Sequence, residues 1–349
     1  MDQIKVGITQ GDINGISYEI IIKTLLDTRI NDFCVPIVYG SAKVAAYHRK
    51  ALNIENFSLN IIRDAEKAHT KKSNVINCSD DSVRVELGKS SPEAGKAAFK
   101  ALDCAVKDLK EGKIDVLVTG PINKDNIQSE DFDFPGHTEY LTQHFGQNRE
   151  TLMLMVSDLM KVGVVTGHIP LKQVPEQLTQ DLILRKLRAM DRTLLQDFKI
   201  RKPRIAVFGL NPHASDGGLM GDEENNIIIP AIKRAKDEDI MAFGPYPADG
   251  FFGSDSITKF DGILAMYHDQ GLAPFKAISF DEGVNFTAGL DIVRTSPDHG
   301  TAYELAGQGE ASPKSFRNAL FLALDVHRNR KEYQELSANP LESNDKSDI

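Results

Sequence analysis

The chain has 349 residues, of which 41% are hydrophobic and 26% charged, and its formal net charge at neutral pH is −9. This length exceeds the roughly 250–300 residues at which one hydrophobic core stops growing, so two packed lobes are expected. The acidic balance disfavours nucleic acid as a partner, because binding phosphates requires a basic surface. No apolar run approaches the ~20 residues of a membrane helix, and the N-terminus lacks a signal-peptide pattern, so a cytoplasmic protein is predicted.

Short apolar runs, each ending in glycine or a polar loop, recur along the chain and predict its strands. Runs rich in Val and Ile that are bounded by Gly, Pro and Asn are typical of buried strands in a mostly parallel sheet. The six clearest examples occupy residues 5–12, 35–41, 115–124, 162–170, 204–213 and 261–271.

Helical patterns fill the intervals between these strands. Residues 90–93 combine a capping-box pattern with proline in the first turn, an apolar stripe follows, and Gly112 marks the end of the helix. A second helix is expected to begin near Thr179 and to continue to Phe198. Because strands and helices alternate, the predicted fold class is α/β, with helices on both faces of mostly parallel sheets. Residues 336–349 are too polar to be buried and are predicted to form a disordered tail.

Three of the nine histidines, namely His168, His213 and His268, follow predicted strands. Ligands of open parallel sheets bind beyond the carboxyl ends of the strands. Neutral imidazoles are common ligands of divalent transition metals, and three of them leaving one position open are typical of a catalytic site. The pattern therefore favours a metal centre over three unrelated surface histidines. Asp249 and Asp269 are candidates for a further ligand or for orienting an imidazole, with loop capping as the alternative for each.

Two further segments contain side chains suited to an anion. His137 and Thr138 stand side by side after a Phe-Pro-Gly turn, where they could hold a carboxylate or a phosphate. Lys276, Asn285 and Arg294 recur at intervals of nine residues. A lysine with an arginine commonly binds phosphate esters or carboxylates, although scattered solvated charges are the alternative for this spacing.

A glycine-rich segment near residues 298–309 is a candidate nucleotide loop. Gly300, Gly307 and Gly309 would let backbone amides approach a ligand closely. The G-x-G-x-x-G fingerprint does not follow any predicted strand, and the glycine-rich residues 7–17 do not fit it either. A conventional Rossmann site is therefore not predicted.

With these residues in view, the sequence resembles the family of 4-hydroxythreonine-4-phosphate dehydrogenases. These are enzymes of pyridoxal phosphate biosynthesis, related in fold to the isocitrate and isopropylmalate dehydrogenases. The likeness covers roughly residues 4–330. It rests on ITQGDINGI, VTGPINK, PGHTEYL, TGHIPL, LNPHASDGGLMGDEE, GPYPADGFF, YHDQGLAPFK and FTAGLDIVRTSPDHGTAYELAGQG. The family's usual TPGDPAGIGPEI reads TQGDINGISYEI here, which leaves the role of this first loop open.

The resemblance implies a set of ligands and an architecture. One divalent metal ion per subunit (zinc, magnesium or cobalt) would be bound by His168, His213 and His268. The phosphorylated substrate would be bound by His137, Thr138, Lys276, Asn285 and Arg294, and NAD or NADP by His299, Gly300 and Thr301. The expected architecture is two α/β/α lobes with a cleft between them, formed by residues 1–130 with 272–335 and by residues 131–271. The implied assembly is a homodimer with the active site at the interface.

The implied reaction is the oxidation of 4-hydroxy-L-threonine 4-phosphate to 2-amino-3-oxo-4-phosphooxybutanoate, which decarboxylates to 3-amino-2-oxopropyl phosphate. A metal bound by neutral imidazoles stays cationic and lowers the pKa of the substrate hydroxyl while hydride leaves for the nicotinamide. Asp249, Asp269 and His137 are the candidate general bases. The alternatives are a decarboxylating dehydrogenase of 4-phosphothreonate or 4-phosphoerythronate, and a metal-binding protein without catalysis.

Overall fold

One twelve-stranded sheet runs through the computed structural model, which describes residues 3–78, 83–146 and 150–339. Its strands are β1 (Ile4–Thr9), β2 (Cys34–Gly40), β3 (Asn60–Ile62), β4 (Asn74–Asn77), β5 (Val116–Thr119), β6 (Leu152–Val156), β7 (Lys161–Thr166), β8 (Arg204–Phe208), β9 (Met241–Tyr246), β10 (Gly262–Tyr267), β11 (Val284–Ala288) and β12 (Val293–Pro297). Their order across the sheet is β3-β4-β2-β1-β5-β12-β11-β6-β7-β10-β8-β9. All six predicted segments contain strands, so the mostly parallel α/β class is confirmed.

Two parallel groups of strands are joined by an antiparallel middle. The strands from β3 to β12 in the sheet order are parallel, as are β7, β10, β8 and β9, whereas β12–β11, β11–β6 and β6–β7 pair antiparallel. The two parallel groups therefore run in opposite directions. Because neighbouring strands are rotated by about 20–25°, the four steps from β5 to β7 add up to a twist of about 80–100°. This twist lets the carboxyl ends of both groups approach the middle strands.

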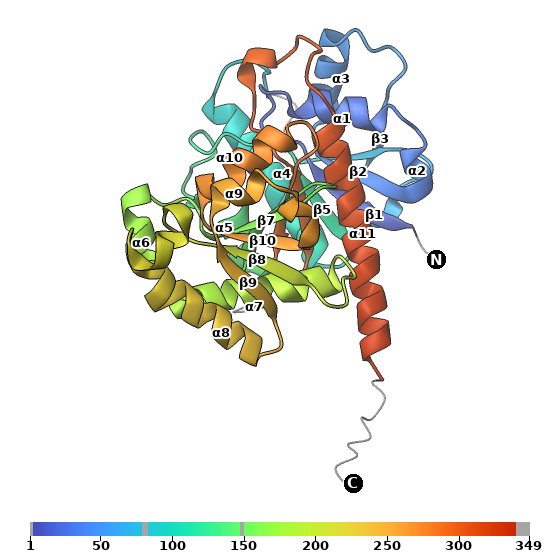
Figure 1. Ribbon diagram of the computed structural model, residues 1–349. Helices are drawn as coiled ribbons and strands as arrows, with labels where there is room; N and C mark the ends of the chain where they lie inside the picture. The colour runs from blue at the N-terminus through green and yellow to red at the C-terminus, as the bar shows by residue number, and fades with distance from the viewer. Residues whose placement is uncertain (1–2, 79–82, 147–149, 340–349) are drawn as a thin grey trace.

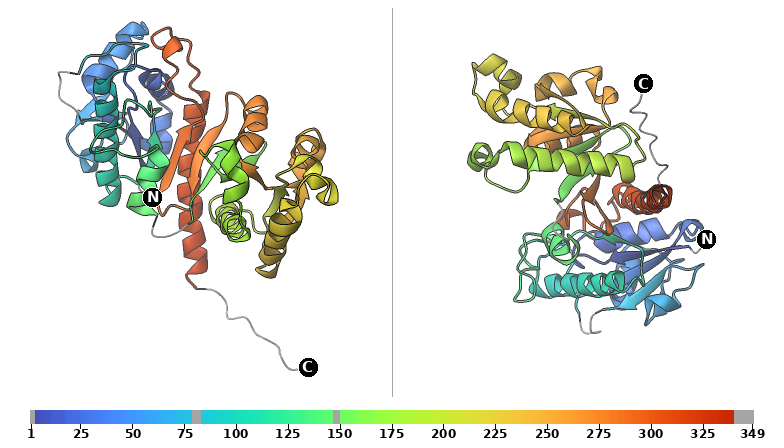
Figure 2. Two further views of the ribbon diagram at one scale, coloured as in Figure 1. Left: turned by 90° about the vertical axis from the view of Figure 1, so that its left-hand side faces the viewer. Right: turned by 90° about the horizontal axis from the view of Figure 1, so that it is seen from below.

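Helices cover both faces of the sheet (Figures 1 and 2). They are α1 (Ser17–Leu25), α2 (Ile30–Phe33), α3 (Ala42–Ala51), α4 (Pro92–Lys110), α5 (His137–Phe145), α6 (Val174–Gln177), α7 (Gln180–Gln196), α8 (Ile229–Asp237), α9 (Ala248–Phe252), α10 (His268–Ile278) and α11 (Lys314–Ser337). Across the described ranges, none of these helices is long and apolar enough to cross a membrane.

The starts of the two predicted helices show how local sequence sets their positions. Thr179 caps α7 by accepting a hydrogen bond from the amide of Leu182, as predicted. In α4 the cap is Ser91, whose hydroxyl accepts from the amide of Ala94. Glu93 therefore occupies the second helical position, not the third that a capping box requires, and the expected box is corrected to a single side-chain cap.

The hydrophobic core differs between the two faces of the sheet. Alternate strand residues point to opposite faces, so Val118 of β5 joins one core cluster and its neighbour Leu117 another. On the first face one continuous cluster extends under α1, α3, α11, α7 and α8. On the second face the core is split into a cluster under α4 and α5 and a cluster under α9 and α10. Between these two clusters, residues of the middle strands line a pocket.

The predicted division into two lobes follows the two groups of strands, but one sheet is continuous across it. Tyr140 and Leu141 of α5 belong to the same core cluster as α4, although the predicted boundary assigns α5 to the second lobe. The lobe boundaries therefore remain a prediction. Figure 2 shows α11 lying between the blue-to-teal part of the chain and the green-to-gold part.

The predicted tail begins inside α11, which includes Leu336 and Ser337, and residues 340–349 lie outside the described residues.

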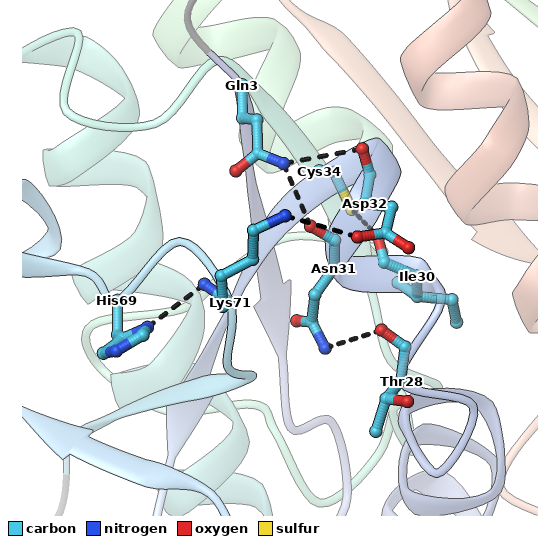
Figure 3. Close-up of polar contacts among 8 residues, drawn as sticks. All are labelled: Gln3, Thr28, Ile30, Asn31, Asp32, Cys34, His69 and Lys71. Carbon is cyan, nitrogen blue, oxygen red and sulfur yellow. Dashed lines mark hydrogen bonds and ion pairs between the residues drawn. The ribbon is translucent and has the colours of Figure 1, made fainter.

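Polar contacts fasten the N-terminal edge of the sheet to α2 (Figure 3). The amide of Gln3 donates to the carbonyl oxygen of Asn31 at 3.0 Å, and Lys71 pairs with Asp32 at 3.3 Å. The side-chain amide of Asn31 donates in turn to the carbonyl oxygen of Thr28 at 3.1 Å. Since the lysine–aspartate pair is exposed, it contributes at most about 1 kcal/mol. These contacts position an edge of the sheet and do not line the pocket described next.

Candidate active site

A pocket of about 290 Å³ lies on the second face of the sheet, between the two split core clusters. We call it the central pocket. Strands β6, β11 and β12 form its floor, and α5 and α10 form its sides. Its lining includes the cationic and polar residues Lys124, His137, Thr138, His168, His268, Lys276, Asn285, Arg294 and His299.

This pocket gathers most of the residues predicted from the sequence. All five predicted substrate residues line it, together with two of the three metal candidates and the first two residues of the predicted cofactor segment, His299 and Gly300. Thr301 and Asp269 directly follow the lining residues Gly300 and His268 in the chain, but they do not line the pocket themselves. His213 and Asp249 line a different pocket, which we call the side pocket, with Tyr267 and Gln270.

Arg294 is the central cation of the pocket. Its side chain is 3% exposed, and burial lowers its pKa to about 10, so that it remains charged at neutral pH. The guanidinium donates to the hydroxyl of Thr119 at 3.1 and 2.7 Å and to that of Thr287 at 3.1 Å. No acidic side chain lies within ion-pair distance of it in the described ranges, although the charge of Glu139, which lines the same pocket, opposes the lowering of its pKa. A buried charge without a direct ion-pair partner is costly, so the pocket is suited to a ligand that supplies further negative charge.

His137 adds a neutral donor beside this cation. It is the first residue of α5, and its Nδ1 accepts from Arg294 at 3.3 Å, which places the ring proton on Nε2. Burial holds the pKa of His137 well below its usual value, and the charges of Arg294 and Lys124 lower it further. The nine-residue helix α5 also presents unpaired backbone amides at this end. The arrangement fits a phosphate or a carboxylate.

Lys276 and Asn285 complete the predicted anion set from the opposite side. The ammonium of Lys276 lies 3.0 Å from the carboxylate of Asp298, whose pKa is raised by burial against the opposing effect of the lysine. The side-chain oxygen of Asn285 is buried and has no hydrogen-bond partner among the described residues. A ligand that carries a hydroxyl or an ammonium group would satisfy this oxygen.

His168 and His268 lie together at the ends of the adjacent strands β7 and β10, with ring centroids 5.4 Å apart. Two imidazoles that share a zinc-like ion at about 2.0–2.1 Å from nitrogen would have centroids about 5 Å apart, so the pair fits such an ion. Nδ1 of His268 lies 2.7 Å from the carboxylate of Asp269, which leaves Nε2 free to bind. Partial burial lowers the pKa of His168, and the charges of Lys124 and His268 lower it further, which favours the neutral, metal-binding form.

His213 is carried away from this pair by the backbone after β8. Residues 213–217 all have positive φ, beginning with φ 54° at His213, and such a left-handed turn is strained in non-glycine residues. The turn leaves His213 exposed in the side pocket, near Asp249. In the part of the chain that the structure describes, no three His, Cys, Asp or Glu side chains are grouped to hold a metal ion. One chain therefore brings together two of the three predicted metal ligands.

One residue that lines the central pocket and two that contact Arg294 were not identified from the sequence. Lys124 stands in the loop after β5, and its charge reaches both His137 and His168. Its position after a predicted strand was a usable signal, because ligands gather at strand ends. Thr119 and Thr287 hold the guanidinium of Arg294. Nothing in their local sequence distinguishes them from other strand threonines.

A mixed α/β sheet with a polar, histidine-containing pocket over its middle strands defines the class: an α/β enzyme whose candidate site lies at the ends of its strands. Comparison with known proteins identifies the family. Residues 32–323 match the family described as pyridoxal phosphate biosynthetic protein PdxA. The chain therefore belongs to the PdxA family and is an enzyme of the dehydrogenase type, which confirms the resemblance seen in its motifs.

Individual relatives agree with this assignment. The 4-hydroxythreonine-4-phosphate dehydrogenase of Bacteroides thetaiotaomicron is 55% identical over 341 residues, which cover 97% of this chain and 93% of the relative. The enzyme of the same name from a Sulfurihydrogenibium species is 42% identical over 328 residues, covering 94% of this chain and all (100%) of the relative. The crystal structure of 4-hydroxythreonine-4-phosphate dehydrogenase from Klebsiella pneumoniae superposes with a TM-score of 0.81 at 34% identity, covering 94% of this chain and 98% of that one.

Proposed function

We propose that this enzyme oxidises 4-hydroxy-L-threonine 4-phosphate with NAD or NADP and a divalent metal ion, and that the product decarboxylates to 3-amino-2-oxopropyl phosphate. The observation that carries the proposal is Arg294, a buried guanidinium that forms no ion pair among the described residues. It shares the central pocket with a pair of adjacent histidines. The names of the relatives supply the particular substrate.

The chain's own groups can bind and orient such a substrate. Arg294 and Nε2 of His137 would hold the anionic end, with the amides of α5 behind them. The free oxygen of Asn285 would accept a hydrogen bond from the amino or hydroxyl group of the substrate. His299 and Gly300 at the edge of the pocket would place the nicotinamide cofactor next to this substrate.

The metal would be bound by His168 and His268 of one chain together with His213. When bound, it supplies Lewis-acid chemistry, which lowers the pKa of the substrate hydroxyl and polarises the keto group. Asp269 orients His268 through its contact with Nδ1. We propose three candidate general bases, which lie in different places. His137 lies in the central pocket, Asp269 beside His268, and Asp249 beside His213 in the side pocket.

The separation of His213 supports a homodimer in which the partner chain supplies the third ligand. Exposed apolar side chains follow the three histidines at different distances along the chain. Leu171 follows His168 and is 69% exposed, Leu219 follows His213 and is 80% exposed, and Phe280, just after α10, is 86% exposed. Large apolar side chains that are this exposed in one chain are candidates for burial in a subunit interface.

Mixing inactive variants tests the shared site. His168→Ala and His213→Ala proteins should each be inactive, but their hybrid dimers would contain one intact site. Random subunit exchange would then restore about a quarter of the wild-type activity, since about half of the dimers are hybrids with one of two sites intact. Mixing His168→Ala with His268→Ala is the matched control and should stay inactive, because both ligands belong to the same chain. Recovery in the control, or none in the first mixture after verified exchange, contradicts the proposal.

A substrate panel tests the reaction. NADH formation should be fastest with 4-hydroxythreonine 4-phosphate, should stop when a chelator removes the metal, and should return on adding zinc, magnesium or cobalt. Faster turnover of 4-phosphothreonate or 4-phosphoerythronate would assign the alternative substrates. No reduction of NAD or NADP with any of the three compounds would favour a non-catalytic metal-binding protein.

A further inference from the structure

The first glycine-rich loop has a structural partner that the sequence does not reveal. Residues 10–16, which we call the first loop, lead from β1 into α1 and are buried throughout. They contact residues 299–311, which we call the cofactor loop because it begins with the predicted cofactor residues. Three groups of contacts join the cofactor loop to the first loop and to helix α1, which follows it.

The hydroxyl of Tyr303 is the first of these contacts. It donates to the carboxylate of Asp12 at 2.8 Å and accepts from the side-chain amides of Asn123 at 3.2 Å and Asn126 at 3.4 Å. Asp12 is fully buried. One oxygen atom of the cofactor loop thus ties this loop both to the first loop and to the loop after β5 that carries the pocket residue Lys124.

A backbone contact fixes the neighbouring part of the cofactor loop. The amide of Ile16 donates to the carbonyl oxygen of Thr301 at 3.0 Å. A Cβ atom at Gly15 would lie 2.5 Å from the same oxygen, so the approach requires glycine at this position. The first loop is therefore shaped to accept Thr301.

Helix α1 holds the far end of the cofactor loop. The ammonium of Lys23 donates to the carbonyl oxygens of Gly309 at 2.8 Å and Ala311 at 2.7 Å. The carboxylate of Glu19 pairs with Lys23 at 2.8 Å and accepts from the amide of Ala311 at 2.9 Å. Both ends of the loop are thus bonded to consecutive parts of one segment, residues 12–23.

The backbone between the first two contacts is strained. Ala302 has φ 42° and ψ 57°, a left-handed conformation that residues other than glycine rarely adopt. Such a conformation persists only where the surroundings enforce it. Here the bonds to Thr301 and Tyr303 on either side supply that constraint.

We propose that residues 12–23 are a positioning element that holds the cofactor loop in its dinucleotide-binding shape before the dinucleotide arrives. The proposal rests on the proposed function, which places NAD or NADP at residues 299–301. A loop that is already ordered loses less conformational entropy on binding, and affinity rises accordingly. Asp12 acts through Tyr303 and is therefore a positioning residue, not a catalytic one.

Tyr303→Phe is the direct test, because it removes the hydroxyl and keeps the ring. Calorimetry should show a dissociation constant for NAD raised by about tenfold, the effect of losing bonds to a buried carboxylate. The KM for NAD should rise in parallel. The kcat at saturating NAD and the KM for the phosphorylated substrate should stay near their wild-type values. A general loss of structure would change all of these quantities together.

Tyr39→Phe is the matched control, because the Tyr39 hydroxyl donates to the carboxylate of Asp108 at 2.6 Å, outside the central pocket. It should lower thermal stability to a similar degree without changing NAD affinity. Gly15→Ala is a second variant that displaces Thr301 without removing a charge, and it should weaken NAD in the same way. If wild-type protein binds NAD and both Tyr303→Phe and Gly15→Ala bind it equally well, the positioning element is refuted. If wild-type protein binds neither NAD nor NADP, the proposed function itself fails.

Discussion

Replacing Arg294 by lysine tests the anion site at its central residue. The guanidinium uses three of its nitrogens to contact Thr119, Thr287 and His137, at distances between 2.7 and 3.3 Å. A lysine keeps the positive charge, but its ammonium is a point charge and cannot reproduce the planar fork. The variant therefore separates the geometry of the site from its charge.

The expected magnitude follows from the bonds that are lost. A hydrogen bond between a charged donor and a ligand is worth about 1.5–3 kcal/mol, and lysine should lose at least one such bond to the bound anion. At about 1.4 kcal/mol for each factor of ten, the KM for the phosphorylated substrate should rise by about 10- to 150-fold. The KM for NAD should change by less than about threefold, because the cofactor loop does not contact Arg294 through any hydrogen bond of the described residues.

Initial rates of NADH formation, measured against each substrate in turn, provide the assay. Arg330→Lys is a matched control, because Arg330 also makes a bidentate contact, with Asp197 at 2.7 and 3.0 Å, but lies on α11 outside the central pocket. It should reduce thermal stability and leave both KM values unchanged. An unchanged substrate KM in folded Arg294→Lys protein, or an equal rise in the KM for NAD, would refute the anion-binding role of Arg294.

Three further predictions concern pH, packing and the metal. The pKa of His137 is lowered in the folded protein, so the unfolded chain binds more protons below about pH 6.5. The contribution of the neutral ring to the free energy of unfolding is complete above that pH and is lost as the pH falls towards the lowered pKa. His137→Gln should therefore reduce the slope of the free energy of unfolding against pH, measured by urea unfolding, by up to about 1.4 kcal/mol per pH unit. An unchanged slope contradicts the burial argument. Gly95→Ala should lower the free energy of unfolding by about 1–3 kcal/mol, because its methyl group would overlap the carbonyl oxygen of Asn126, whereas a gain in urea midpoint would show that the neighbouring loop yields. Asp269→Asn should weaken zinc binding by about 10- to 100-fold in a competition titration with a chelating dye, since Asp269 orients His268, and equal affinity would remove it from that role.

The sequence by itself determined those strands and helix starts that depend on residues close together in the chain. Val- and Ile-rich runs marked six of the strands, and Thr179 marked the start of α7. Such signals work because side-chain periodicity and helix capping involve neighbours in the chain. The motifs also identified the family, and the five residues they predict to bind the substrate all line the central pocket.

The antiparallel middle of the sheet could not be predicted in this way. Strands β11 and β12 contain Asn285 and Arg294, polar residues that interrupt the continuous apolar runs from which the other strands were predicted and that line the central pocket. A search for continuous apolar runs therefore did not find these two strands. The pairing of β11 with β6 joins residues more than a hundred positions apart, and no local pattern specifies such a contact.

Tertiary structure alone decided which of the predicted site residues meet. The hydroxyl of Thr119 reaches Arg294 across 175 positions of the chain, and Tyr303 reaches Asp12 across 291. His213 follows a strand just as His168 does, yet a left-handed turn, formed mostly by residues that seldom adopt positive φ, directs it into the side pocket. Strand ends can be read from short segments, but the direction of the chain beyond them depends on contacts that form only when the whole sheet has twisted into place.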